Sequence, residues 1–451
     1  MDKTQFEIDV TDLAFNGKAV GHLDGKVIFL DGGLPGERVL AEITSDRKRY
    51  NKATVVKILK ESERRVPAMC SHFQYCGGCT WQDLTYQDQL TFKKKQVMDC
   101  LERIGGLSET VVRDVIGSVE VFRYRNKMEF SFNAADDNNF SLGLHRRGRF
   151  DEIFNVERCF LTQDIVSDIV RWIRDYVKQN GIPVYDVRNH TGYFRFAMIR
   201  QSKRTADLML NMVTNYGHFP DRDVFIREIT RAFPKITTIV HNENGQKSNI
   251  ATGEKETVLY GCGYIEERLF ETAFRIRANS FFQTNTVQTE TLYRTGFDML
   301  EPHRNHRVLD LYCGTGSIGI LISHWVDYVV GVELVPDAVQ AARENAHLNN
   351  IQNIEFYQGF VRDYLKEYDH PENFFDIVIV DPPRAGLHPK ALKRILNLAP
   401  EKILYISCNP STFARDAKEL VAGGYLAPEV RPVDMFPHTM HIELASVFHK
   451  K

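Results

Sequence analysis

The chain has 451 residues, a length that predicts two or three domains. Hydrophobic residues make up 43% and charged residues 26%, a balance that excludes a fully disordered chain. Because 57 Lys and Arg residues face 59 Asp and Glu residues, the formal net charge is -2, and any nucleic-acid site must be a local basic patch.

The N-terminus and the cysteines indicate the cellular compartment. The opening sequence MDKTQFEIDV lacks the apolar core of a secretory signal, and no apolar run approaches the roughly 20 residues of a membrane-spanning helix. We expect a cytoplasmic protein with no membrane contact, and a monomer. In a reducing cytosol, clustered cysteines among the eight present favour metal binding or catalysis over disulfides.

Residues 1–62 consist of short predicted strands separated by Gly-rich turns, the clearest being 26–30, 38–43 and 53–59. Such a succession of short strands predicts a small closed OB-like β-barrel. A basic run beside Tyr50 is either a solvated face or a surface that follows an RNA backbone. It comprises Arg47, Lys48, Arg49, Lys52, Lys57, Lys60, Arg64 and Arg65.

Residues 63–270 mix helices and strands and are expected to form a central α+β domain. Helices are predicted over 84–106 and 164–181, and paired strands over 123–133 and 141–154. Because flipped-out RNA bases stack on aromatic rings while guanidinium groups hold phosphates, the side chains on and beside these strands predict an RNA surface. An ordinary charged sheet face is the alternative. The set is Arg123, Arg125, Lys127, Arg146, Arg147, Arg149, Phe122, Tyr124, Phe130 and Phe150.

Residues 271–451 alternate strand, turn and helix. The buried strands RVLDL, YVVGVE, DIVIV and ILYIS predict an α/β fold with a doubly wound parallel sheet, that is, a Rossmann-like domain.

The turn after the first of these strands has the character of a nucleotide-binding loop. Asp310 stands near the strand end, and Gly314 and Gly316 follow, so the backbone can approach a ligand closely. Glu333 ends the next strand, where an acid can accept hydrogen bonds from ribose hydroxyls. Because the loop does not read G-x-G-x-x-G, it favours S-adenosyl-L-methionine over a dinucleotide. Cys313 inside the loop is interpreted as a small packed residue.

Three further strands deliver Asp381, Cys408 and Glu443 to the same edge of the sheet. Arg384 occupies the position after Asp-Pro-Pro where many amino-methyltransferases place an aromatic ring, which argues against methylation of an exocyclic amine. Cys408 is either a core residue or a nucleophile, and its place at a strand end favours the nucleophile. Glu443 is either a general base or a surface carboxylate.

A nucleophilic cysteine beside a methyl donor indicates one reaction in particular. Carbon 5 of a pyrimidine is too weak a nucleophile to take a methyl group directly. Addition of a thiolate to carbon 6 creates an enolate that is nucleophilic at carbon 5, and a base must then remove the carbon 5 proton.

The motifs in this order closely resemble the RNA uracil-5-methyltransferase family over nearly the whole chain. They are ANSFFQTN (278–285), DLYCGTGSIG, GVE (331–333), VDPPRAG (380–386), SCNP (407–410) and FPHTMHIE (436–443). The resemblance implies Cys408 as nucleophile, Glu443 as general base, and an N-terminal TRAM domain for RNA binding. It also implies that S-adenosyl-L-methionine is contacted by Gln283, Tyr312, Glu333 and Asp381. The 23S ribosomal RNA branch is the most similar, with the same chemistry on transfer RNA as the alternative.

Cys70, Cys76, Cys79 and the distant Cys159 form a candidate metal site. Four thiolates can hold zinc or an iron–sulfur cluster, and the spacing does not choose between them. Members of the resembling family with this pattern carry a [4Fe–4S] cluster, which is therefore expected, in a structural or RNA-positioning role. Cys100 and Cys262 are expected in the core.

Three other functions are weighed against uracil-5-methylation. RNA cytosine-5-methyltransferases use the same adduct but usually carry a cysteine after a proline in the motif that reads DPPR here. A redox or sensor protein would leave the cofactor loop, the DPP turn and Cys408 unexplained. A non-catalytic RNA-binding protein would be expected to lack Cys408 or Glu443, and both are present.

Overall fold

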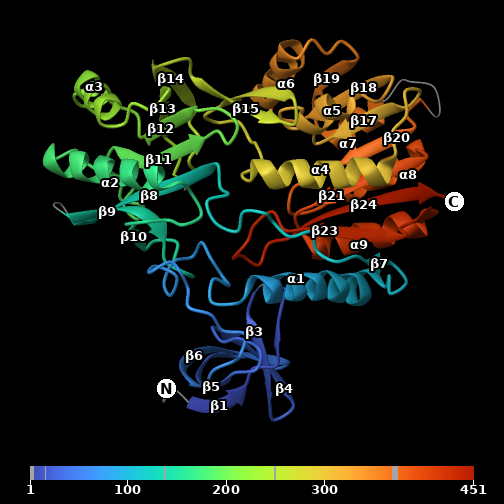
Figure 1. The fold of residues 1–451 in the computed structure, drawn as a ribbon, viewed down its shortest axis with the longest axis horizontal. Helices are drawn as coiled ribbons and strands as arrows, with labels where there is room; N and C mark the ends of the chain where they lie inside the picture. The colour runs from blue at the N-terminus through green and yellow to red at the C-terminus, as the bar shows by residue number, and fades with distance from the viewer. Residues whose placement is uncertain (1–4, 16, 137–138, 248–249, 368–373) are drawn as a thin grey trace.

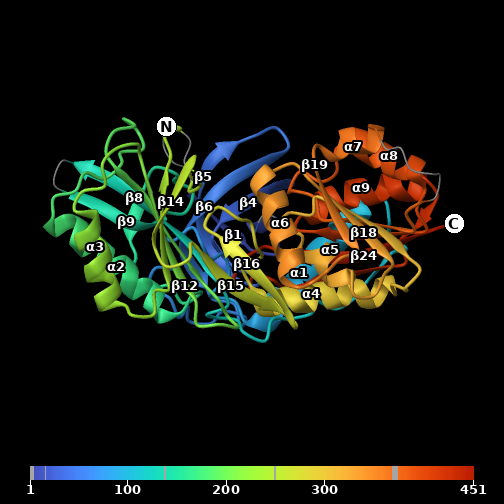
Figure 2. The same ribbon diagram turned by 90° about the horizontal axis from the view of Figure 1, so that it is seen from above.

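A computed structural model describes residues 5–15, 17–136, 139–247, 250–367 and 374–451. Figure 1 shows three parts: N-terminal strands at the bottom, a central sheet at the left and a C-terminal sheet at the right. Helix α1 (Tyr86–Cys100) lies between the N-terminal strands and the C-terminal part. Viewed from above, the central and C-terminal parts form the two ends of an elongated body (Figure 2). No helix among the described residues is long and apolar enough to cross a membrane.

The N-terminal part is a six-stranded sheet in the order β1-β5-β6-β4-β3-β2. Its strands are β1 (Gln5–Asp9), β2 (Asp12–Leu13), β3 (Ala19–Leu23), β4 (Lys26–Asp31), β5 (Arg38–Asp46) and β6 (Tyr50–Lys60). Among the described residues no hydrogen-bond ladder joins β1 to β2, so the predicted barrel is open at that seam. Trp81 and Phe92, from beyond these strands, complete its hydrophobic core.

The central part is a seven-stranded sheet in the order β10-β9-β8-β11-β12-β13-β14. The strands are β8 (Lys127–Asp136), β9 (Asn139–His145), β10 (Ile153–Asn155), β11 (Phe194–Gln201), β12 (Leu208–Thr214), β13 (Thr238–Glu243) and β14 (Lys255–Tyr260). Helices α2 (Asp164–Gln179) and α3 (Arg222–Ala232) pack on it through a shared core that includes Ile169 and Phe225. The hairpin β15 (Tyr264–Leu269) and β16 (Thr272–Arg277) leads to the C-terminal part.

The C-terminal sheet has the order β19-β18-β17-β20-β21-β24-β23-β7. Five parallel strands, β17 (Arg307–Leu311), β18 (Tyr328–Glu333), β19 (Ile354–Gln358), β20 (Ile377–Val380) and β21 (Lys402–Ser407), are followed by antiparallel β24 (Glu443–Lys450). Beside it lie β23 (Glu429–Val433) and β7 (Val111–Val112), and β22 (Tyr425–Leu426) also pairs with β24. After β17 the chain adds β18 and β19 on one side of that strand, and then β20 and β21 on its other side. The direction in which strands are added therefore reverses between β17 and β20. Ligands of such sheets bind at that reversal, beyond the carboxyl ends of the strands.

Helices cover both faces of this sheet, which explains its continuous apolar strands. They are α4 (Thr286–Leu300), α5 (Ser317–Ile322), α6 (Pro336–Leu348), α7 (Val361–Glu367), α8 (Pro389–Leu398) and α9 (Pro410–Ala422). Alternate residues of β20 enter two different cores: Ile377 and Ile379 face the side of α4, while Val378 and Val380 face the side of α8 and α9. The predicted doubly wound fold is confirmed.

The predicted helix over 84–106 is α1 followed by a π-helical turn at Leu101–Gly105, and it ends at Gly106 with φ of 65°. Glycine adopts this left-handed conformation without strain, so the prediction that the helix ends at a glycine C-cap is confirmed.

Candidate active site

The cofactor-type loop begins at the buried Asp310 on β17. One carboxylate oxygen accepts the Gly319 N–H at 2.9 Å, and the other is buried without a hydrogen-bond partner among the described residues. Burial, with Asp381 nearby, raises the pKa of Asp310 to about 8. An unpartnered buried oxygen at the strand reversal is suited to a polar group of a ligand. The sequence pattern predicts Asp310 in the loop but not as a cofactor contact, because its unpaired oxygen appears only in the folded structure.

Glu333, at the end of β18, closes the other side of the loop. Its carboxylate accepts the N–H of Gly314 at 3.1 Å and the N–H of Val335 at 2.8 Å. Gly316, with φ of 78°, precedes α5, and a Cβ there would lie 2.9 Å from the ring of Phe356. Only glycine allows this close approach, as the sequence predicts.

Two of the other predicted cofactor contacts directly follow strands of this sheet, and Gln283 lies shortly before α4. Tyr312 directly follows β17 and has a left-handed φ of 64°. Gln283 is buried. Its backbone carbonyl accepts the side-chain N–H of Asn126 at 2.9 Å, which connects this segment to the central part. Asp381 follows β20, and burial raises its pKa to about 7.

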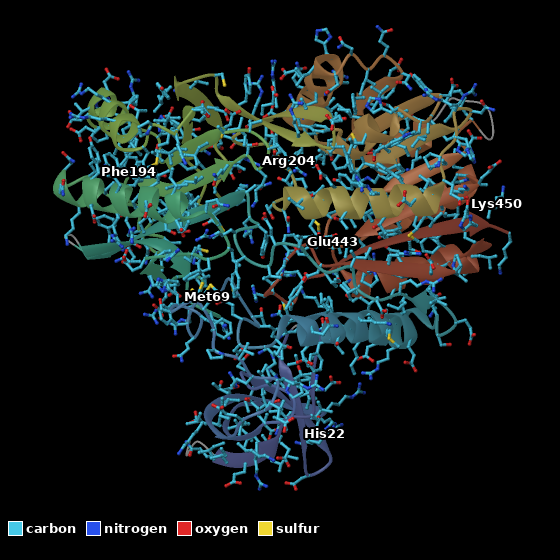
Figure 3. The ribbon with its side chains drawn as sticks, in the orientation of Figure 1. His22, Met69, Phe194, Arg204, Glu443 and Lys450 are labelled. Carbon is cyan, nitrogen blue, oxygen red and sulfur yellow. The ribbon has the colours of Figure 1, made fainter. Side chains whose placement is uncertain are left out.

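Cys408 and Glu443 lie at the same edge on adjacent strands. Ser407, the last residue of β21, pairs with Leu444 of antiparallel β24, so Cys408 and Glu443 directly flank this pair. Glu443 is only 3% exposed, so the alternative of a surface carboxylate is wrong. Figure 3 shows it at the end of β24 that faces the centre of the molecule, with Lys450 at the other end.

The electrostatics of this edge couple the thiol to its neighbours. Burial, with Glu443 and Asp381, raises the pKa of Cys408 to about 11, and Arg384 opposes the shift. Burial and Asp381 likewise raise the pKa of Glu443 well above its ordinary value. The DPPR turn is fixed to this site because the Arg384 carbonyl accepts the side-chain N–H of Asn409 at 2.9 Å.

The four predicted metal-binding cysteines line one cavity of about 420 Å³, although Cys159 is distant in sequence. Burial raises the pKa of Cys79 to about 12 and of Cys159 to about 11, and the other cavity cysteines add to both shifts. N–H groups point at two of the sulfurs: Gly78 at Cys76, 3.3 Å, and the Gln82 side chain at Cys79, 3.4 Å. Within the described part of the chain, no group of three or more His, Cys, Asp or Glu residues is close enough to hold a single metal ion.

The remaining cysteines divide as follows. Cys100 and Cys313 are buried as predicted, whereas Cys262 is exposed in the turn between β14 and β15, so its prediction as a core residue is wrong. The prediction rested only on the lack of a metal-ligand spacing around Cys262, which does not exclude an exposed thiol.

The predicted RNA surface of the central part is only partly exposed. Tyr124 and Phe130 are fully buried in its core, so they cannot stack bases, and Phe150 is 75% exposed. Arg147 donates to the carbonyls of Phe73 and Cys79 and so supports the cysteine segment. Strand alternation does not distinguish an aromatic core position from an exposed one when both faces of the sheet are covered.

The N-terminal basic run also divides. Arg65 forms ion pairs with Glu37 and Asp83, and Arg64 with Asp88, so these two have structural partners. The others are exposed: Arg47, Lys48, Arg49, Lys52, Lys57 and Lys60.

The doubly wound sheet, the glycine loop and the terminal acid of β18 together define an S-adenosyl-L-methionine-dependent methyltransferase. Comparison with known proteins specifies the class further. A family model described as tRNA (Uracil-5-)-methyltransferase matches residues 237–451, and a TRAM domain model matches residues 3–56. An uncharacterized RNA methyltransferase of Chlorobaculum tepidum is 38% identical, covering 98% of this chain and 96% of that protein. One of Caldanaerobacter subterraneus is 37% identical and covers 98% of each.

A solved structure extends the likeness to nearly the whole fold. The crystal structure of Pyrococcus abyssi tRNA (uracil-54, C5)-methyltransferase in complex with S-adenosyl-L-homocysteine has a TM-score of 0.78 and 31% identity. The match covers 98% of this chain and 99% of that one. The chain belongs to the RNA uracil-5-methyltransferase family and carries an N-terminal TRAM domain.

Proposed function

We propose that this enzyme methylates carbon 5 of a specific uridine in 23S ribosomal RNA, with Cys408 as the nucleophile and Glu443 as the general base. The observation that carries the proposal is the pairing of Ser407 with Leu444, which sets Cys408 beside Glu443 at the cofactor edge of the sheet. A thiol next to a buried carboxyl group is the pair of groups that addition and elimination at a pyrimidine require.

The proposed reaction regenerates both the 5,6 double bond of the base and the Cys408 thiolate. The Cys408 thiolate forms a bond to carbon 6, and the electrons of the 5,6 double bond move into an enolate. Carbon 5 then takes the methyl group that S-adenosyl-L-methionine supplies. Glu443 removes the carbon 5 proton, the 5,6 double bond re-forms, and the bond between carbon 6 and sulfur breaks, which restores the Cys408 thiolate. The high pKa of Cys408 implies that the thiol is protonated at rest, so its proton must pass to solvent before addition, while Glu443 stays free to take the carbon 5 proton.

We assign the cofactor contacts to Gln283, Tyr312, Glu333 and Asp381, with Asp310 as an addition. Support comes from the strand reversal between β17 and β20, because Asp310 and Tyr312 lie at the end of β17, Asp381 follows β20 and Glu333 ends the neighbouring β18. The two loop hydrogen bonds of Glu333 fix its carboxylate near the strand end, where ribose hydroxyls would be bound.

We assign a [4Fe–4S] cluster to Cys70, Cys76, Cys79 and Cys159. The residues fit such a group because four thiols face one cavity and N–H groups aim at two of the sulfurs. When bound, the cluster would supply a rigid cross-link between residues 70–79 and Cys159, and methyl transfer needs no electron from it.

The choice of 23S ribosomal RNA rests on the joint presence of the cysteine pattern and the TRAM domain. Transfer RNA is the second candidate, because the structural relative is named for a tRNA uridine. The test is transfer of labelled methyl groups to 23S and transfer RNA transcripts, with nucleoside analysis. Labelled 5-methyluridine in 23S RNA alone supports the proposal; label confined to transfer RNA overturns the ribosomal assignment. The enzyme is proposed to act as a monomer, which sedimentation with and without RNA tests.

A further inference from the structure

One loop carries the proposed base and is held by side chains from far along the chain. Residues 434–442, here called the base loop, connect β23 to β24, and Glu443 follows directly. His438 at its centre has a left-handed φ of 66°. A non-glycine residue keeps such a conformation only where its surroundings determine it, so the contacts of the base loop are of particular interest.

Gln89 of α1 binds the strained residue through its side-chain oxygen. Its side-chain oxygen accepts the backbone N–H of His438 at 2.8 Å, and its amide nitrogen lies 3.2 Å from His438 Nδ1. The same nitrogen donates to the carbonyls of Trp81 and Leu84, both at 2.9 Å. The backbone N–H groups of Thr80 and Trp81 donate to the His438 carbonyl, so the segment after the cysteines joins the same network.

Lys93, one turn further along α1, holds the start of the loop. Its ammonium group lies 2.6 Å from the Asp434 carboxylate and donates to the Phe436 carbonyl at 3.1 Å. Tyr86 donates to the second Asp434 oxygen at 3.0 Å. Both charged side chains of the pair are completely buried. A buried ion pair adds little net stability compared with apolar packing, but it specifies one geometry.

We propose that Gln89 and Lys93 are positioning residues for the methylation reaction, fixing the base loop so that Glu443 reaches the carbon 5 proton. The inference rests on the proposed function, in which Glu443 removes that proton. Both residues act through the loop, since their hydrogen-bond partners lie on the loop and on the segment leading into α1. Their loss slows the transfer of the proton to Glu443, so the bond between carbon 6 and Cys408 persists after methyl transfer.

The test compares Gln89→Met and Lys93→Met with Gln87→Met and Lys94→Met, matched changes at more exposed α1 positions. Each enzyme is given labelled S-adenosyl-L-methionine and either a uridine or a 5-fluorouridine transcript of 23S and transfer RNA. No base can remove fluorine as a cation from carbon 5, so every enzyme molecule that methylates the fluorinated RNA stays attached. The readout is the amount of denaturation-resistant, methylated adduct on uridine RNA divided by that on fluorinated RNA.

We expect this ratio to be near zero for the native enzyme and the controls, and to rise in Gln89→Met, Lys93→Met and Glu443→Gln. In the two α1 variants kcat should fall about 10- to 100-fold, while KM for RNA changes by no more than about twofold. Lys93→Arg, which keeps the charge, should restore most of the lost kcat. Because unfolded protein forms no adduct on either RNA, the ratio reports only on folded enzyme.

A fall in kcat without adduct on uridine RNA would assign Gln89 and Lys93 a purely structural role and overturn the proposal. Where the methionine variants do not fold, Gln89→Glu, which keeps the acceptor and loses the donor, must show the same adduct for the proposal to stand. Adduct with Glu443→Gln but not with the α1 variants refutes only this inference. Absence of adduct with Glu443→Gln refutes the proposed role of Glu443 itself.

Discussion

Cys408 directly follows β21 and Glu443 begins the antiparallel neighbour β24, so both residues flank the pair formed by Ser407 and Leu444. The arrangement brings a nucleophile and a carboxyl group from motifs far apart in the sequence to one edge. The Glu443 carboxylate also helps to raise the pKa of the Cys408 thiol, because a negative charge disfavours another close by.

Replacing Glu443 should therefore make Cys408 a stronger acid. The Glu443 carboxylate contributes to the rise of the Cys408 pKa to about 11, so Glu443→Gln should lower that pKa. Alkylation of Cys408 by iodoacetamide at pH 8, followed by peptide mapping, should then be faster, because more of the thiol is ionised. Glu401→Gln, before the opposite end of β21, is the control and should leave the rate unchanged. An equal or slower rate in Glu443→Gln would show that the two groups do not interact.

The cofactor loop should depend on Glu333. Glu333→Gln loses the ionised acceptor for the loop N–H groups, and S-adenosyl-L-methionine should bind about 10- to 100-fold more weakly, as measured by calorimetry. Glu355→Gln on neighbouring β19 should retain native affinity. Unchanged binding in Glu333→Gln would remove this residue from the site.

Asp310 should make the cofactor-free protein less stable as the pH rises. Its folded pKa of about 8 exceeds the ordinary value of 3.8, so between these values the native state holds a proton that the unfolded state has lost. The free energy of unfolding therefore falls with increasing pH across this window and levels off above pH 8. Asp310→Asn has no such titrating group. The difference between its free energy of unfolding in urea and that of the native protein should therefore shift in favour of the variant from pH 5 to pH 8. An advantage independent of pH would contradict the raised pKa.

The cysteine cavity should bind iron and inorganic sulfide. Cys159→Ser removes one of the four cysteines that line the cavity. The variant should lack stoichiometric iron and sulfide when purified without oxygen. Cys262→Ser changes an exposed thiol and should keep both. One zinc ion and no sulfide in the native protein would favour the zinc site that the spacing left open.

Much of this architecture follows from local sequence. The period-two strands, the buried runs and the glycine loop predicted the OB-like sheet and the doubly wound domain, because such patterns reflect short-range geometry. The proximity of Cys159 to Cys70 and of Gln89 to His438 depends on tertiary packing and has no local sign. Burial was also misjudged from pattern alone, as the core positions of Tyr124 and Phe130 and the exposed Cys262 demonstrate.

The decisive experiment isolates the protein–RNA adduct that Glu443→Gln forms with labelled S-adenosyl-L-methionine. After digestion we expect a peptide containing Cys408 that carries a methylated uridine, and its complete loss in the Cys408→Ala, Glu443→Gln double variant. A label attached to any other residue, or 5-methyluridine produced at the native rate by Cys408→Ala, would contradict it.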